Sequence, residues 1–286
     1  MPLEVLEHWD QEPDDDALIW RYLTMYKFRD LMANEESYFR RPDGFDDKAE
    51  GIPSEKMVAQ LGGWDRFVIT ERPQIDNIRG SFSQFRESYF ISSWTLHSEE
   101  NLRMWYEYVV DKHQDVKPRD LHGLAICSRY GALKAVLNAL IDTTYVGAVW
   151  YDKYNLKRPG NVICQICSKE KEYKWEREIR AMLYFPAIHS GGNLHIDGEG
   201  RPHPDVLQEN QQYRYHWHQD HKRRRIDLKA LIEGIVMSPW ASPDVLKEVK
   251  DDWVRIKGHS YPVTDSSLKS PLMPSFSEYF EKRHLW

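Results

Sequence analysis

The stretch Trp175-Glu176-Arg177-Glu178-Ile179-Arg180 joins a charged run to an apolar one, residues 181–185. The alternation predicts a strand over residues 175–185, with Glu176, Glu178 and Arg180 on one face. Two carboxylates this close repel each other unless a cation or a ligand satisfies them. Two interpretations stay open: a solvated strand edge with Arg180 and Lys174 as ion-pair partners, or a substrate-binding pair of carboxylates.

Composition limits the class of protein. The chain has 286 residues, 41% hydrophobic and 13% aromatic, enough for one large or two modest domains with a core. The net charge of -6 gives no global basic field for nucleic acid. Three cysteines do not suit a disulfide framework, and the N-terminus has no signal-peptide features. With no run of about 18 apolar residues, the sequence predicts a cytoplasmic protein without a membrane span.

Hydrophobic periodicity predicts an α+β fold: a mixed sheet or sheets of short strands with peripheral helices. Residues 1–16 are expected to form a disordered acidic leader, 17–270 one domain with a polar insertion at 189–225, and 271–286 an aromatic tail. The predicted helices are 24–34, 102–110, 131–141 and 244–257. The predicted strands are 17–23, 37–42, 89–95, 121–128, 145–151, 161–168, 175–185, 234–238 and, as a strand or extended segment, 258–270.

Three motifs have simpler structural interpretations. The run Cys164-Gln165-Ile166-Cys167 has zinc or redox spacing, but on a strand its two thiols face opposite sides, which favours buried structural cysteines. The histidine-rich run 216–221 could hold a metal, yet it is more typical of a solvated loop, so no metal is expected. The run Lys222-Arg223-Arg224-Arg225 could meet phosphate or nucleic acid, but a solvated basic loop is favoured.

The remaining constellation lies on three predicted strands: Arg21, the run Ser92-Ser93-Trp94-Thr95, and the pair Glu176 and Glu178. A guanidinium offers a planar fork to phosphate, and strand hydroxyls can hydrogen-bond a carboxylate. A carboxylate can bind a ribose hydroxyl and stabilise positive charge on a sugar carbon. Each residue has a structural alternative, and it is the combination in this order that points to chemistry on a sugar.

Motifs across residues 18–270 resemble those of a widespread bacterial family of unknown function. The matching residues are Trp20-Arg21-Tyr22, then Phe45-Asp46-Asp47 with Glu50, then Met104-Trp105 with Tyr108, then Trp175 with Glu176, Glu178 and Arg180, and finally Ile235–Pro239 and Ser266–Leu268. In the loop, Asp46 and Lys48 stand where the family has Asn and Pro. The resemblance implies no activity.

The same order of residues also resembles the arginine-serine-glutamate class of ADP-ribosyltransferases, whose fold is a split β-sandwich around a cleft that holds NAD. The resemblance implies that Arg21 contacts NAD phosphate or ribose and that Ser92 or Ser93 braces the catalytic glutamate. Glu178 would hold the nicotinamide ribose and assist C–N cleavage, and Glu176 would orient the acceptor. The cofactor site would be completed by the aromatic residues Tyr22, Trp94, Trp105 and Tyr106. Here Ser-Ser-Trp-Thr stands where the family has Ser-Thr-Ser.

The second resemblance implies an ADP-ribosyltransferase-like, NAD-using enzyme, either a transferase or an NAD glycohydrolase, that acts as a toxin or anti-phage effector. The alternative is a non-catalytic sensor module of a bacterial defence system that binds a nucleotide or a partner protein. Nucleic-acid binding through residues 222–225 is disfavoured by the negative net charge. The enzyme hypothesis expects Arg21, Ser92 or Ser93, and Glu178 to converge on one cleft.

Overall fold

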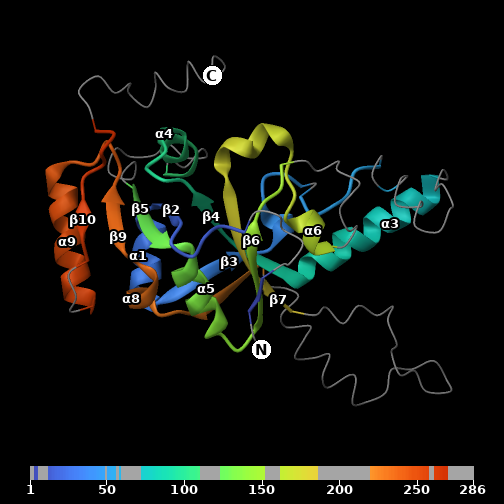
Figure 1. Cartoon of the computed structure of the whole chain (residues 1–286), viewed down its shortest axis with the longest axis horizontal. Helices are drawn as coiled ribbons and strands as arrows, with labels where there is room; N and C mark the ends of the chain where they lie inside the picture. Colours follow the sequence, from blue (N-terminus) through green and yellow to red (C-terminus); the bar gives the residue numbers. More distant parts are fainter. Residues whose placement is uncertain are drawn as a thin grey trace.

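The computed structural model describes residues 3–5, 12–48, 50–55, 58, 72–109, 123–151, 162–185, 220–257 and 261–269. These residues form helices and one mixed, largely antiparallel sheet of short strands, which confirms the predicted α+β class (Figure 1). Most of the polar insertion at 189–225, including His216 and His218, and the tail at 271–286 lie outside the described residues.

The sheet runs in the order β1-β6-β7-β4-β2-β5-β9-β10, and β3 and β8 form a branch from β4. Only the two outermost pairings of this order, β1 with β6 and β10 with β9, are parallel among the described strands. The strands are β1 (Glu4–Val5), β2 (Leu18–Thr24), β3 (Glu36–Arg40), β4 (Tyr89–Leu96), β5 (Gly123–Arg129), β6 (Thr143–Ala148), β7 (Glu178–Tyr184), β8 (His221–Arg225), β9 (Gly234–Met237) and β10 (Val263–Thr264).

Strand β4 splits the sheet, because two different strands pair with the same edge of it. Its other edge pairs with β7 along nearly its whole length. On the split edge, β2 pairs at Thr95 and Leu96, whereas β3 pairs at Ile91. Residues Ser92–Trp94 lie where β2 and β3 diverge, and we call this opening the fork. The described strands thus form one forked sheet. The split β-sandwich around a cleft that the resemblance implies stays a prediction.

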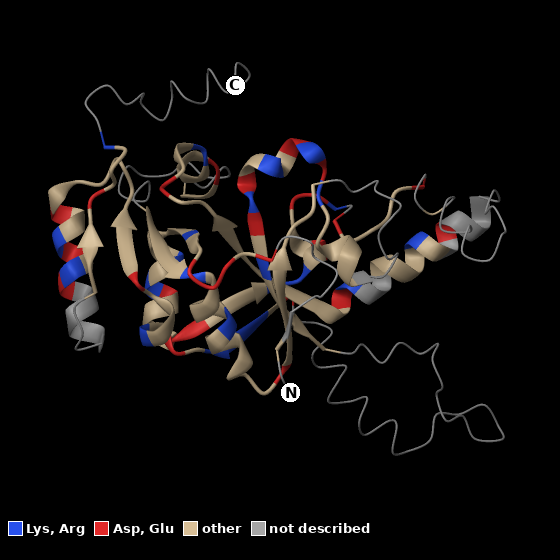
Figure 2. Cartoon of the chain, viewed as in Figure 1, with Lys and Arg blue, Asp and Glu red and all other residues tan. Residues whose placement is uncertain are grey.

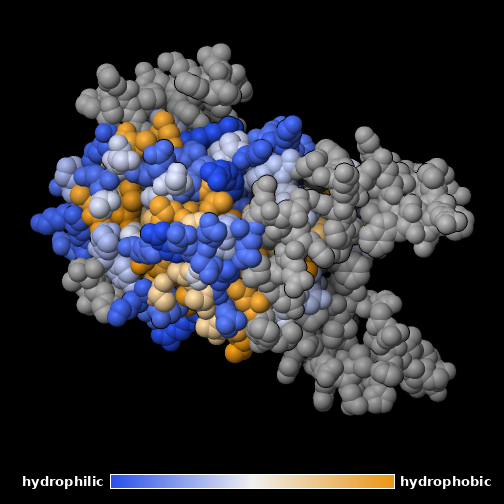
Figure 3. All heavy atoms as spheres, viewed as in Figure 1, coloured by the Kyte–Doolittle hydropathy of each residue, from blue (hydrophilic) through white to orange (hydrophobic). Residues whose placement is uncertain are grey.

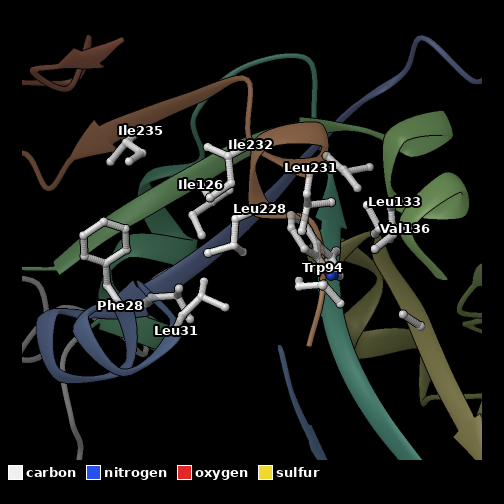
Figure 4. Packing of buried hydrophobic residues seen from close by; sticks show 14 of the residues in the cluster. Phe28, Leu31, Trp94, Ile126, Leu133, Val136, Leu228, Leu231, Ile232 and Ile235 are labelled. Atoms are coloured by element: carbon white, nitrogen blue, oxygen red, sulfur yellow. The ribbon is translucent and has the colours of Figure 1, made fainter. Parts of the chain in front are cut away.

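One face of the sheet, the α1 face, carries the largest hydrophobic cluster. Its side chains come from the strands and from α1 (Met25–Asn34), α5 (Tyr130–Asn138), α8 (Leu228–Leu231) and α9 (Pro243–Lys257). Figure 4 shows those of α1, α5 and α8 against the strands. Phe28, Leu31 and Met32 of α1 recur at helical spacing, and Thr24 caps that helix by accepting a hydrogen bond from Lys27 N. Each large apolar side chain buried here contributes about 1.5–3 kcal/mol.

The opposite face, the α4 face, carries two smaller apolar clusters. One joins Trp20 and Tyr22 to α4 (Leu102–Met104) and the π-helical turn η4 (Trp105–Val109). The other joins Ile91 and Met182 to α6 (Val162–Ile166). The register of β4 and β7 leaves a polar gap between the two clusters, filled by Ser93, Thr95, Glu178 and Arg180. The remaining helical segments are α3 (Arg72–Phe85), η1 (Pro42–Gly44), η3 (Arg86–Ser88) and η6 (Lys171–Glu176).

Segment 161–168, predicted to be a strand, is helix α6 followed by a turn. Its β-branched residues favour a strand locally, but the helix places Cys164 and Cys167, three residues apart, on one side. Both cysteines are buried as expected, and Cys167 Sγ lies 3.6 Å from Met182 Sδ of β7. Packing against the sheet therefore overrides local propensity.

The basic run 222–225, predicted to be a solvated loop, forms most of β8 and pairs with β3. Lys222 is buried, and each arginine has a carboxylate partner, so the run does not present four free cations to phosphate or nucleic acid. The ion pairs are Arg223 with Asp30 at 2.7 Å, Arg224 with Asp142 at 2.5 Å and Arg225 with Glu35 at 2.8 Å.

The leader, expected to be disordered, contributes strand β1, which pairs with β6.

Hydrophilic residues cover most of the coloured surface in Figure 3, and apolar residues form patches between them. Across the described ranges, we find no helix with the length and apolar character needed to span a bilayer.

Gly123 lies at the start of β5, where there is no room for a side chain. A Cβ at this position would lie 2.5 Å from the Leu23 carbonyl oxygen and closer still to the Val109 side chain. Neither β2 nor η4 can yield without moving its neighbours, so Gly123→Ala is expected to lower the free energy of unfolding by about 1–3 kcal/mol. Urea unfolding would measure this, with Gly80→Ala, whose Cβ meets nothing within 4 Å, as the control. Equal unfolding midpoints for the two variants would contradict the packing argument.

Candidate functional site

The candidate residues divide between the two faces of the sheet. Because Ser93 lies opposite Arg180 and Thr95 opposite Glu178, these four residues share the α4 face. Ser92 and Trp94 alternate with them and lie on the α1 face, together with Arg21. The structure therefore brings Ser93 and Glu178 together and places Arg21 and Ser92 on the other side of the sheet.

Glu176 is not part of strand β7. The chain leaves η6 at Arg177, whose φ of 45° is left-handed, and only then enters the strand at Glu178. The predicted alternation across residues 175–180 is therefore wrong at its start. The turn nevertheless brings both carboxylates to one cation: Lys169 Nζ lies 2.6 Å from Glu176 Oε2 and 2.8 Å from Glu178 Oε2.

Glu178 lies at the centre of a buried polar network. Ser93 Oγ donates to Glu178 Oε1 at 2.6 Å, and Arg180 donates to both carboxylate oxygens, at 2.9 and 3.1 Å. Burial alone would raise the pKa of Glu178, but the charges of Arg180 and Lys169 outweigh it and lower the pKa to about 2. Glu178 is therefore ionised at neutral pH. Figure 2 shows acidic and basic residues following one another from η6 into β7.

The inner end of the network is fully enclosed. Arg180 has no exposed surface, and it donates to Glu50 Oε1 and to the Ile166 carbonyl oxygen as well as to Glu178. Its guanidinium carbon lies 5.8 Å from the centre of the Phe45 ring. Burial raises the pKa of Glu50 despite the opposing charge of Arg180, so the environments of Glu50 and Glu178 push their pKa values apart.

The outer end of the network reaches the surface through Tyr108. The Tyr108 residue is 42% exposed, whereas its hydroxyl points inward and donates to Glu176 Oε1 at 2.7 Å. Burial of the hydroxyl and the charge of Glu176 raise the pKa of Tyr108 well above its ordinary value. The π-helical form of η4 is a common feature of functional sites, and here it accompanies the inward placement of this hydroxyl.

The network unites segments that are far apart in the sequence. Glu50 and Phe45 come from the loop motif Phe45-Asp46-Asp47 with Glu50, Tyr108 from the Met104-Trp105 motif, and Glu176 to Arg180 from the Trp175 motif. The sequence named Glu176 and Glu178 as catalytic candidates, but it named Phe45, Glu50 and Tyr108 only as motif matches. It missed Lys169 and Tyr151, whose hydroxyl accepts from Glu178 N at 2.6 Å. The one available signal for Lys169 was that a Lys lay in a charged run directly before two carboxylates.

The aromatic residues expected to stack on a cofactor are packed into the interior. Trp105 and Tyr106 have no exposed surface, and Tyr22 meets Trp105 edge-on with ring centres 4.8 Å apart. Tyr22 Oη also accepts a hydrogen bond from Asn101 N at 2.9 Å. These contacts hold α4 and η4 against β2, and hence position Tyr108.

The chemistry available at this site is that of three carboxylates held by two cations. Glu50, Glu176 and Glu178 are each at most 5% exposed, and Arg180 and Lys169 bridge them. No group of three or more His, Cys, Asp or Glu in the described part of the chain is placed to hold a metal ion. Such a site can hold a proton on one carboxylate while it keeps another ionised.

Comparison with known proteins gives no match to a protein-family model, to a curated protein or to a solved structure.

Proposed function

We propose that this chain is an ADP-ribosyltransferase-like enzyme that cleaves the glycosidic C–N bond of NAD at the Glu176–Glu178 end of the network. The observation that carries the proposal is the 2.6 Å hydrogen bond from Ser93 Oγ to the ionised carboxylate of Glu178. A buried, oriented carboxylate is suited to stabilise a cationic sugar carbon, because its negative charge is already in place and does not have to reorient during the reaction.

In the proposed reaction the bond between the ribose carbon and the nicotinamide nitrogen breaks, and its electron pair leaves with nicotinamide. Glu178 stabilises the positive charge that develops on the ribose carbon. Water, or a hydroxyl or amine of an acceptor, then adds to that carbon and gives its proton to Glu176, which lies at the outer end beside Tyr108. With water the enzyme is an NAD glycohydrolase, and with another acceptor it is a transferase.

Arg21 takes no part in this proposal, because it lies on the α1 face, opposite Glu178. Arg103 is an exposed cation near the outer end of the network. Its guanidinium carbon lies 3.9 Å from the ring centre of Trp175, the residue before Glu176. We propose this stacked pair in place of Arg21 as the contact for the nucleotide.

The test is nicotinamide release from NAD, measured by mass spectrometry. Glu178→Gln is expected to reduce turnover about 100-fold or more, because the amide carries no charge to stabilise the cationic carbon. Ser93→Ala should reduce it less, because the carboxylate keeps Arg180 and Lys169. Thr95→Ser, a conservative change on the same face, is the folding and activity control. Absence of both turnover and NAD binding in the unsubstituted protein would refute the proposal.

A second candidate, a non-catalytic sensor module, is favoured by one feature: both oxygens of Glu178 are already engaged by Ser93, Arg180 and Lys169. A carboxylate so fully compensated is suited to hold a binding surface rather than to react. This candidate predicts that NAD raises the melting temperature while no nicotinamide is released. If turnover is found, expression of the protein beside Glu178→Gln tests whether it acts as a toxin or anti-phage effector.

A further inference from the structure

Arg21 is a largely buried cation whose charge has no carboxylate partner among the described residues. Its two hydrogen bonds there go to neutral acceptors, Ser37 Oγ and the Tyr38 carbonyl oxygen, both at 3.2 Å. Burial lowers the pKa of Arg21 to about 10, the direction expected of a guanidinium that is desolvated without a compensating charge. A guanidinium has five N–H donors, so most of its donor capacity is unused within the described structure.

Two further polar groups at the fork are buried and have no hydrogen-bond partner among the described residues. They are Ser92 Oγ and Trp94 Nε1, on residues that are 2% and 3% exposed. Arg21 and Trp94 each adjoin the last pairing of β2 with β4, Trp20 with Thr95, and the Arg21 guanidinium carbon lies 5.7 Å from the Trp94 ring centre. Ser92, two residues from Trp94, faces the same side of the sheet. A buried hydroxyl and indole N–H are seldom left unpaired.

The chemistry of these groups selects the ligand. The indole N–H and the guanidinium can only donate, and a serine hydroxyl can donate as well. A second cation lies nearby: Lys222 is 3% exposed on the α1 face, and its Nζ lies 5.4 Å from the ring of Phe90, the residue two before Ser92. Donors around the uncompensated charge of Arg21 match an acceptor-only, negatively charged group.

We propose that the fork binds a small oxyanion, a phosphate or carboxylate group, through Arg21, Ser92 and Trp94 on the α1 face. The site lies across the sheet from Glu178 and is independent of NAD cleavage. The oxyanion offsets the charge of Arg21, supplies acceptors to Ser92 and Trp94, and fastens β2 to β3 where the sheet divides. The bound oxyanion therefore stabilises the fold, and the stability of the fold depends on the anion concentration.

The experiment measures thermal unfolding of the full chain in sodium phosphate and in sodium acetate, against sodium chloride of the same ionic strength, with calorimetry for affinity. Phosphate or acetate is expected to raise the melting temperature by about 5 °C or more over chloride when present at about 100 times its Kd. The Arg21→Met variant should melt in chloride no lower than the unsubstituted protein, and it should lose the anion response. Ser92→Ala should weaken binding about tenfold.

Two control variants distinguish binding at the fork from anion binding elsewhere on the protein. Arg40→Met removes an exposed arginine of the neighbouring strand β3 and should keep the full response. Glu178→Gln should also keep the full anion response, so the oxyanion proposal can hold even if the NAD proposal fails. An equal melting temperature in all three salts, or an unchanged anion response in Arg21→Met and Ser92→Ala, overturns the proposal. If Arg21→Met fails to fold, Ser92→Ala and Trp94→Phe decide in the same assay.

Discussion

Replacing Arg180 by Gln is expected to lower the free energy of unfolding at neutral pH by about 3–5 kcal/mol. Arg180 is completely buried and is the only described cation that contacts both Glu50 and Glu178. Without it, two buried carboxylates face each other with Lys169 alone to compensate them, and the Ile166 carbonyl oxygen loses its charged donor. Urea unfolding followed by tryptophan fluorescence would measure the loss.

Two comparisons make this result specific to the network. Arg177→Gln, the same change three residues earlier at an exposed position, should cost less than about 0.5 kcal/mol. Adding Glu50→Gln to Arg180→Gln should restore at least about 1 kcal/mol, because it removes one of the uncompensated carboxylates. Additive effects of the two substitutions would show that Glu50 and Arg180 do not act as a pair.

Local signals in the sequence predict most elements of this fold. The strand-forming residues of segment 89–95 and the helical spacing of Phe28, Leu31 and Met32 are properties of short segments, and the structure has β4 and α1 where those patterns lie. Segment 161–168 was predicted wrongly because Val, Ile and Cys suit a strand as well as a buried helix.

The division of the candidate residues between two faces could not be read from the chain. Ser92 and Ser93 necessarily face opposite sides of a strand, but which one meets Glu178 depends on the register between β4 and β7, nearly ninety positions apart in the sequence. The position of Arg21 depends in the same way on β2 pairing with β4 and β5. The sequence suggested a contact between a serine and Glu178, and long-range pairing selects Ser93.

The joining of Glu176 and Glu178 depends on a backbone feature that the residue pattern conceals. Arginine seldom adopts a φ of 45°, so nothing in the run Trp175–Arg180 signals a turn there. Because η6 ends at Glu176, this carboxylate approaches Lys169 from outside the strand. Glu50 and Tyr108 reach the network from loop and helix segments whose positions only tertiary packing determines.

Acid is expected to destabilise the protein through Glu178, and by more than it destabilises Glu178→Gln. The pKa of Glu178 is about 2 in the folded protein against an ordinary value of 4.5, chiefly because Arg180 and Lys169 overcome the effect of burial. The ionised carboxylate therefore contributes stability that is present above pH 4.5 and is lost as the pH falls toward 2. At 1.36 kcal/mol per pH unit, the full loss is about 3 kcal/mol.

Urea unfolding of both proteins at intervals from pH 6 to pH 2 would measure this difference. The stability of the unsubstituted protein relative to Glu178→Gln should stay constant above pH 5 and decline below it. Glu50 opposes this trend, because burial raises its pKa and its protonation on acidification favours the folded state. Because both proteins carry Glu50, this effect cancels in their difference, and it should appear instead as a steeper loss of stability in acid for Glu50→Gln than for the unsubstituted protein. If the stabilities of the two proteins ran parallel across the whole pH range, the folded environment would not hold Glu178 as an ion. The proposed role of this carboxylate in stabilising the sugar cation would then lose its physical basis.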